Sequence, residues 1–471
     1  MVLRLPLAVT GLATRPFNKL TTTNAANRWM STLIHHKFDH NLSLPSTLKS
    51  STVYRPNYER SWSMPRPFCS TPIKEIEEQG IGMKSVGGPV LAWSEDEVML
   101  RGTVQKFAHQ NIKPLVSEMD EKAKLDKTLL AQLFEAGFMG IEVAGKYGGS
   151  EMTFTQTCIV IEELAKIDPA ISVIVDIHNT LNNHILSKYG SEFQKERYLY
   201  RMATQSLSSF CLSEPSAGSD AFALKTVAVP SHDKKTYTLK GTKMWISNAA
   251  EADIFLVFAN VNPTLGYKGI TAFIVDRNSP GLSIGKKENK LGIRASSCCE
   301  VVLDNVQVDA HAILGKEGMG YKIAIESLNE GRIGIGAQMI GLAQGALNAT
   351  MPYLFERKQF GHPVATFQGM QFQIAQAHTE LEAAKLLVYN AARMKDAGMD
   401  VQLQAAYAKL YSSQIAEKIA SKCIEWSGGV GFTKEFPMEK FFRDVKIGQI
   451  YEGTSNMQLQ TIGRLLSREF K

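Results

Sequence analysis

The spacing of apolar residues changes twice along the chain, and these changes constrain the fold more than any other feature. Between residues 92 and 205 apolar residues recur at i, i+3 and i+4, as in VMLRGTVQKFAHQNI and DKTLLAQLFEAGFMG, which indicates amphipathic helices. From about Ser206 the period becomes two, and short runs such as TYTLKGTKMWIS, DIFLVFANV and GITAFIVD are separated by turn residues. From about Gly318 long helical patterns return, rich in Ala and Gly. The sequence therefore predicts an α+β protein with a helical domain at 92–205, a β domain at 206–317 and a helix bundle at 318–471.

The net charge of +6 is concentrated at the N-terminus. Residues 1–70 hold nine of the 52 basic residues and two of the 46 acidic ones, so the remaining 43 and 44 nearly balance and give no reason to expect a polyanion partner. No acid precedes Asp39, and arginines are spaced among many Ser and Thr. Residues 1–70 therefore predict a mitochondrial transit peptide and linker, with a disordered basic tail as the alternative.

The six cysteines, at positions 69, 158, 211, 298, 299 and 423, form no Cys-x-x-Cys pair. This spacing gives no indication of a zinc site or a redox couple, and no metal is expected; free thiols in a reducing compartment are the simplest interpretation. No run of 18 apolar residues lacks charge, so we expect no membrane span.

One carboxylate stands out near the C-terminus, in the stretch IYEGTSN. Glu452 lies between a tyrosine and Gly453, and Thr454, Ser455 and Asn456 follow at once, ahead of the helical pattern NMQLQTIGRLL. A surface turn would explain the glycine and the hydroxyls. It does not explain why a helix should begin beside that carboxylate.

Other stretches are polar or charged where the pattern leads one to expect apolar residues. They are FCLSEPSAGSD where helix gives way to strand, Trp245 beside Ser247 in a strand, Glu330 and Arg332 in LNEGRIG, and the segments FERKQFG and EWSGGVGF. Each has a structural explanation by itself: a loop, a core tryptophan, an ion pair or a helix stop. No G-x-G-x-x-G fingerprint is present.

Taken together and in this order, SEPSAGSD, MWIS, ERKQFG, GGVGF and IYEGTSN make the chain resemble the acyl-CoA dehydrogenases over residues 92–466. SLNEGRIGIGAQMIGLAQG and SKCIEWSGGVGFTK are most similar to the branch that acts on short branched acyl-CoA such as 2-methylbutyryl-CoA. The resemblance implies a helical domain, a barrel-like β domain and a helix bundle. It also implies FAD-dependent α,β-dehydrogenation in the mitochondrial matrix, serving fatty-acid and isoleucine catabolism, with electrons leaving to electron-transferring flavoprotein and a homotetrameric assembly.

An acyl-CoA dehydrogenase of other chain specificity, for isobutyryl-CoA or a short straight chain, is one alternative. Two functions outside the dehydrogenases also remain open at this point. An acyl-CoA oxidase would share the fold but pass electrons to oxygen; the basic N-terminal stretch and the final residues Glu469, Phe470 and Lys471, which are not a Ser-Lys-Leu signal, argue against a peroxisomal oxidase. A non-catalytic flavoprotein that serves as an assembly partner is the second alternative, and the presence of Glu452 argues against it.

The resemblance also assigns roles to individual residues. Glu452 is the expected catalytic base, and Gly453 leaves room for substrate. FAD is expected to contact Phe210, Leu212, Ser213, Gly218, Ser219, Trp245, Ile246 and Ser247, the helix start at Thr454, Ser455 and Asn456, and, from a neighbouring subunit, Arg357, Gln368, Glu425, Gly428 and Gly429. Substrate contacts are expected at Ser219, Tyr267, Tyr321, Asn329, Arg332 and Gly453.

A second position for the base has to be weighed. In some branches of the family, notably the isovaleryl- and long-chain enzymes, the base stands just before the arginine of the LNEGR helix, where this chain has Gly331. Glu330 is one residue away and should point about 100° round the helix. Glu452 is therefore the preferred assignment.

Overall fold

The computed structural model describes residues 89–470, so the predicted transit peptide and linker at 1–70 lie outside the described residues. The first part of the described chain is helical, as predicted. Its longer helices are α1 (Glu95–Phe107), α2 (Val116–Lys122), α3 (Lys127–Glu135), α4 (Phe154–Ala165), α5 (Pro169–Asp176), α6 (His184–Tyr189) and α8 (Tyr200–Thr204). A π-helical turn, η4 (Ile177–Asn183), joins α5 to α6, and a second one, η5 (Lys195–Leu199), precedes α8. In the part of the chain that the structure describes, no helix is both long and apolar enough to cross a membrane.

Capping explains where several of these helices begin. Ser94 and Glu97 form the reciprocal capping box of α1, Thr153 and Gln156 form that of α4, and Asp168 caps α5 ahead of Pro169. Each pair satisfies backbone N–H groups that the first turn of a helix leaves without a partner.

The middle of the chain forms one eight-stranded sheet in the order β6-β7-β3-β2-β4-β5-β8, with β1 paired to β4. The strands are β1 (Ser208–Cys211), β2 (Val227–Pro230), β3 (Thr236–Ser247), β4 (Ile254–Asn260), β5 (Ile270–Asp276), β6 (Leu282–Lys287), β7 (Cys298–Asp309) and β8 (Ile313–Leu314). Leu256 and Phe258 of β4 pack on one side, with helices α6 and α8, while Phe255 and Val257 pack with β3 and β7 on the other. Burial on both faces explains why this strand is a continuous apolar run.

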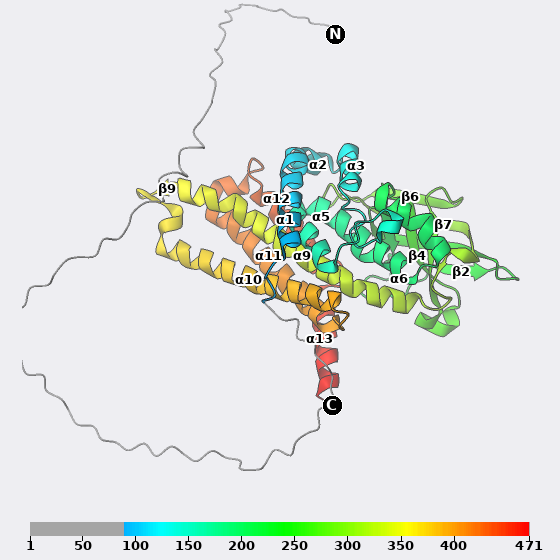
Figure 1. Ribbon diagram of the computed structural model, residues 1–471. Helices are drawn as coiled ribbons and strands as arrows, with labels where there is room; N and C mark the ends of the chain where they lie inside the picture. The colour runs from blue at the N-terminus through cyan, green and yellow to red at the C-terminus, as the bar shows by residue number, and fades with distance from the viewer. Residues whose placement is uncertain (1–88, 471) are drawn as a thin grey trace, which may run out of the picture. The chain divides into compact units, whose positions relative to one another are not determined.

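The last part is a helix bundle. It consists of α9 (Gly320–Glu356), the hairpin β9 (Lys358–Gln359) and β10 (His362–Pro363), α10 (Gln368–Asp396), α11 (Gln402–Ser427), α12 (Met438–Val445) and α13 (Ser455–Glu469). Figure 1 shows α9 running from the sheet toward the hairpin, between the first helices and α10 and α11. The predicted fold class is thus confirmed.

Small residues allow α9 to lie close to its neighbours. A Cβ at Gly341 would overlap the backbone carbonyl of Glu162 in α4, and a Cβ at Gly336 would meet Val388 of α10 at 3.0 Å. Apolar residues of α1 to α5 and of α9 to α12 form a single core on either side of this helix. The two helical parts of the sequence therefore share one hydrophobic interior.

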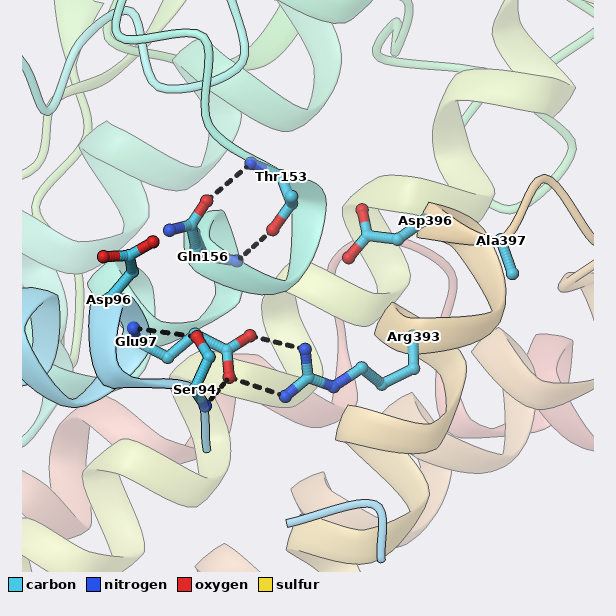
Figure 2. Close-up of a pocket in the computed structure, with 8 residues that line it drawn as sticks. All are labelled: Ser94, Asp96, Glu97, Thr153, Gln156, Arg393, Asp396 and Ala397. Atoms are coloured by element: carbon cyan, nitrogen blue, oxygen red, sulfur yellow. Dashed lines mark hydrogen bonds and ion pairs between the residues drawn. The ribbon is translucent and has the colours of Figure 1, made fainter. Parts of the chain in front are cut away.

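The junction between α1, α4 and α10 contains a surface pocket of about 390 Å³, shown in Figure 2. Four of its eight lining residues are the capping residues already described, Ser94, Glu97, Thr153 and Gln156. Glu97 also pairs with Arg393 of α10, and the Asp396 carboxylate accepts the backbone N–H groups of Phe154 and Thr155 at 2.8 and 3.0 Å. Because these polar groups bind one another, the pocket is a polar seam between helices and contributes nothing to the chemistry described below.

Candidate active site

Glu452 lies in the short loop between η10 (Lys446–Gln449) and α13, where the backbone takes an unusual path. Glu452 has φ +52° and Gly453 has φ +85°, so two consecutive residues are left-handed. A left-handed residue with a side chain costs roughly 1 kcal/mol or more and persists only where its surroundings hold it. Here Gln458 donates to the carbonyls of Glu452 and Gly453 at 3.1 and 2.9 Å, and Lys409 of α11 donates to the Gly453 carbonyl at 2.7 Å.

Helix α9 makes room for the Glu452 carboxylate. A Cβ at Gly331 would lie 3.0 Å from Glu452 Oε2 and 3.0 Å from Leu181 of η4. The two positions weighed for the base, Gly331 and Glu452, are therefore adjacent in space. Because Gly331 has no side chain, the Glu452 carboxylate occupies the space beside it.

The Glu452 carboxylate is shielded although the residue as a whole is only half-buried. Its Oε2 atom is out of contact with solvent and has no hydrogen-bond partner among the described residues. Burial raises the pKa of Glu452 to about 7, against the opposing charges of Arg332 and Lys409. A carboxylate in this state is a much stronger base than one in water, and it is still ionised in a large fraction of molecules at neutral pH.

A second buried carboxyl, Asp176 at the end of α5, lies beside the first. A Cβ at Gly334, one turn along α9 from Gly331, would overlap the Asp176 carboxyl. Thr180 donates to it at 3.0 Å, and burial together with the charge of Glu452 raises the pKa of Asp176 well above its ordinary value. Asp176 is therefore the neutral member of the pair when Glu452 is ionised.

Glu330 points elsewhere, as the helical geometry predicted. Its carboxylate lies 2.7 Å from His184 Nδ1 and 2.8 Å from Lys395 Nζ. Glu330 is buried and its two partners are partly buried, on another side of α9. The structural ion pair that the sequence left open is thus the interpretation that fits Glu330.

The polar loop after β1 is held by a buried ion pair. Lys243 of β3 is fully buried and donates to Glu214 at 2.8 Å and to the Leu212 carbonyl at 3.2 Å. Glu214 also accepts the backbone N–H groups of Lys225 and Thr226 at 2.6 and 3.0 Å. Burial alone would raise the pKa of Glu214, but the charge of Lys243 and these hydrogen bonds lower it, so the carboxylate stays ionised.

Trp245 lies two residues after Lys243 and is turned out of the sheet. The pairing of β3 with β7 is interrupted between Lys243 and Ile246, and Trp245 in this bulge has φ +63°. Its side chain is 58% exposed, in contrast to Ile246, which is buried. An exposed indole in a strained bulge is not core packing; it offers a flat surface to a ligand.

The structure joins the two predicted flavin segments. Met244 donates through its backbone N–H to the Ser213 carbonyl at 2.9 Å, and Ser209 donates to the Ser247 carbonyl at 2.9 Å. Phe210 and Leu212 lie in or just after β1, while Gly218 and Ser219 lie in the exposed part of the loop. Residues 210–219 and 245–247 therefore form one surface.

The start of α13 lies immediately after Glu452. Thr454 is the N-cap and accepts the Met457 N–H at 3.3 Å. The Ser455 hydroxyl oxygen is buried, with no partner in the described part of the chain, and Asn456 is exposed. Free N–H groups and an unpaired hydroxyl at the N-terminus of a 15-residue helix suit an anionic group such as a phosphate.

The predicted substrate residues form two groups. Arg332 donates to Asn329 at 2.9 Å, and its Nη2 atom would lie 3.9 Å from a Cβ at Gly453. This distance places Arg332 beside the residue that follows Glu452. Tyr267 and Tyr321 lie near the start of α9, with ring centroids 4.6 Å apart and Phe222 4.5 Å from Tyr321.

The remaining predicted residues are not brought to Glu452 within one chain. Arg357 follows Arg332 by 25 positions along α9, which corresponds to about 37 Å. Arg357, Gln368, Glu425, Gly428 and Gly429 are all exposed, at the ends of α9 and α11 and the start of α10.

Comparison with known proteins decides the family. Models of the N-terminal, middle and C-terminal domains of acyl-CoA dehydrogenases match residues 94–206, 209–306 and 318–467. The chain belongs to the acyl-CoA dehydrogenase family. A probable short/branched chain specific acyl-CoA dehydrogenase of Dictyostelium discoideum is 60% identical over 82% of this chain and 94% of its own length.

Two further proteins extend the comparison. The mitochondrial short/branched chain specific acyl-CoA dehydrogenase of Rattus norvegicus is 54% identical over 88% of this chain and 95% of its own length. The three-dimensional structure of butyryl-CoA dehydrogenase from Megasphaera elsdenii matches with a TM-score of 0.78 and 38% identity, over 80% of this chain and 99% of that one. Family membership confirms the predicted enzyme class, the acyl-CoA substrate and FAD as the cofactor.

Several residues that shape this acyl-CoA dehydrogenase site were not predicted from its sequence: Lys409, Gln458, Asp176, Glu214 and Lys243. For the four charged residues among them, the signal in the sequence is a charge inside an apolar pattern, such as Lys409 in QAAYAKLYSSQIA, and Gln458 gives no such signal. That signal does not say which group the charge meets.

The Glu214–Lys243 pair yields a stability prediction. Lys243→Met leaves a buried carboxylate without its cation, so we expect a loss of about 3–5 kcal/mol in the free energy of unfolding, together with weaker FAD retention. The double variant Glu214→Gln/Lys243→Met, which removes both charges and keeps an acceptor for residues 225 and 226, should recover much of that loss. Denaturant unfolding and the flavin content of purified protein measure both quantities, and a double variant no better than the single one would contradict the role of the pair.

Proposed function

We propose that this enzyme dehydrogenates short, branched acyl-CoA thioesters with Glu452 as the catalytic base. The observation that carries the proposal is the state of the Glu452 carboxylate: Oε2 is buried and unpaired, it faces the space left by Gly331, and the cations of Arg332 and Lys409 act on it. Glu330 does not compete, because His184 and Lys395 already occupy its carboxylate.

The reaction requires a strong base in a dry site. The α-proton of a thioester is far less acidic than an aqueous carboxylic acid, so Glu452 must be more basic than usual, and its burial provides this. The α-proton passes to Glu452, and the thioester oxygen gains negative charge as it does so. The backbone N–H of Glu452 is the donor that the family resemblance implies for that oxygen, and a fixed donor of this kind stabilises the developing charge.

The described residues fit FAD. Trp245 offers an exposed ring in a bulge beside Ser247, residues 210–219 adjoin it, and the α13 N-terminus presents the unpaired Ser455 hydroxyl. When bound, FAD would supply the acceptor for the β-hydrogen, which would leave the acyl chain as hydride. The protein's part is to hold the ring against the β-domain surface, to orient the acyl chain toward Glu452 and to exclude water from the base.

The substrate class rests on the relatives. Two proteins described as short/branched chain specific are 60% and 54% identical to this chain. We therefore propose 2-methylbutyryl-CoA or a similar short branched thioester as substrate, a role in isoleucine catabolism, and electron-transferring flavoprotein as the electron acceptor.

The pH dependence of flavin reduction tests the base. Glu452 must be ionised to accept the α-proton. The rate of flavin reduction should therefore be low at acid pH, reach half of its maximum near pH 7 and level off above that. Glu452→Gln should keep FAD and lose about 10²- to 10⁴-fold or more in rate at every pH. Stopped-flow flavin absorbance measures both. A Glu452→Gln variant with near-normal turnover would overturn the assignment of Glu452.

A panel of thioesters tests the function and the substrate class. Anaerobic titration with 2-methylbutyryl-, isobutyryl-, isovaleryl-, butyryl- and octanoyl-CoA should bleach the flavin fastest with the 2-methyl-branched substrate, and reoxidation in air should be slow. Preference for octanoyl- or isovaleryl-CoA would contradict the substrate class. Fast reoxidation would indicate an oxidase, and no bleaching with any of the five would favour a non-catalytic flavoprotein.

We further propose a homotetramer in the mitochondrial matrix, with the N-terminal stretch removed and the three parts bounded at about residues 92–205, 206–317 and 318–471. Arg357, Gln368, Glu425, Gly428 and Gly429 are exposed at the end of α9, the start of α10 and the end of α11, and Arg357 lies about 37 Å along α9 from Arg332. A neighbouring subunit would bring this set to a second FAD. The rat relative is described as mitochondrial.

Protein isolated from cell fractions tests this assembly and its location. It should appear in the matrix fraction, begin after the basic stretch and have four times the mass of one mature chain by light scattering. A stable, flavin-loaded and active monomer would contradict the shared site.

A further inference from the structure

Lys409 is a buried cation whose fixed partner is not a carboxylate. Its side chain is fully buried in α11, and its ammonium donates to the Gly453 carbonyl at 2.7 Å. Among the described residues, the other buried lysines are Lys243 and Lys440, and each contacts a carboxylate within 3 Å. Burying a lysine costs several kcal/mol unless its surroundings compensate, so its presence beneath the base calls for a reason.

The first part of that reason is the conformation of the loop. The carbonyl that Lys409 holds is that of Gly453, the residue after Glu452, and these two consecutive residues are both left-handed. Gln458 donates to the same carbonyl and to that of Glu452. Because the two donors come from different helices, α11 and α13, the loop is fastened from two directions.

The second part is charge. Arg332 from α9 and Lys409 from α11 are the cations that act on Glu452, while Asp176 from α5 and Tyr451 in the loop are the neighbouring acidic groups. Burial lowers the pKa of Lys409 to about 7, and the charge of Glu452 opposes that effect while the charge of Arg332 adds to it. The ammonium and the carboxylate therefore support each other's charged form and titrate as a pair.

We propose that Lys409 is a positioning residue for the base: its ammonium holds the Gly453 carbonyl, which keeps Glu452 aimed into the site, and its charge keeps the carboxylate ionised. This inference rests on the proposed role of Glu452. It adds that the base depends on a lysine 43 positions earlier in the chain, on a different helix.

Two matched substitutions separate the parts of this role. Lys409→Met removes a hydrogen bond and a charge, whereas Gln458→Met removes hydrogen bonds to the same loop and no charge. Lys409→Met should lower the rate of flavin reduction and move the acid limb of its pH profile upward by about one unit, because a nearby opposite charge has been lost. Gln458→Met should lower the rate and leave the acid limb in place.

A readout without turnover keeps the test independent of the proposed reaction. The Glu452 carboxyl has an ordinary pKa of 4.5 and a raised one of about 7 in the folded protein, so the stability of wild type relative to Glu452→Gln should decline as pH rises from 4.5 and level off above 7. The same comparison is made between Lys409→Met and Lys409→Met/Glu452→Gln. The difference in stability between these two variants should level off about one pH unit higher than it does in the wild-type background. Thermal unfolding of the flavin-loaded proteins measures it.

The outcomes are distinct. Upward movement of both profiles supports the proposal. A folded, flavin-loaded Lys409→Met variant whose acid limb and stability profile coincide with wild type overturns it. If wild type reduces no acyl-CoA, the proposed function fails, but the stability profiles still decide whether Lys409 controls the ionisation of Glu452. Should Lys409→Met not fold, Lys409→Arg replaces it: a retained acid limb with a reduced rate supports the proposal, and unchanged values of both overturn it.

Discussion

The close approach of α9 to its neighbours is the constraint on which the site depends. Gly331 and Gly334 lie one turn apart on this helix, and each leaves the space that a carboxyl group fills, Glu452 at the first and Asp176 at the second. Gln338, one turn further, contacts Tyr451 and donates to the Pro169 carbonyl at 2.7 Å. One face of α9 therefore positions both the loop that holds Glu452 and the segment from α5 to η4. A side chain at either glycine would push the carboxyl away from its position.

The electrostatics of the site follow from that packing. Excluding water from two carboxyl groups and two cations raises the free energy of every charged form. The arrangement of neighbouring charges and hydrogen bonds then determines which groups are ionised. Arg332 and Lys409 favour the ionised form of Glu452, while Asp176 has only the hydroxyl of Thr180 and remains neutral. The result is a single basic carboxylate beside a neutral one. Two neighbouring ionised carboxylates would repel each other, and this difference in protonation avoids that cost.

In the β domain, the surface formed by residues 210–219 and 245–247 is also held in place by buried charged groups. The buried Glu214–Lys243 pair secures the loop after β1 to strand β3, and the bulge that follows turns Trp245 outward. A buried ion pair contributes little net stability, but it specifies one arrangement of the loop, since any other would leave a charge without its partner. The strain at Trp245, like that at Glu452, lies next to groups that hold it in place.

The order of periods along the chain was sufficient to predict three parts and their type, because the period of apolar residues reports which face of each element is buried. The stretch IYEGTSN was sufficient to single out Glu452 and a helix beginning at Thr454, since a capping residue acts on its own turn. The partners of Glu452 were out of reach. In the sequence, Gly331 is only a position without a side chain, and Lys409 is only a charge in an alanine-rich helix. The residues around them do not indicate that both positions lie beside the same carboxylate. Burial, charge pairing and clearance depend on atoms far apart in sequence. The sequence by itself singled out Glu452 as the candidate base, and the tertiary structure, which removes water from around its carboxylate, decided how basic that carboxylate is.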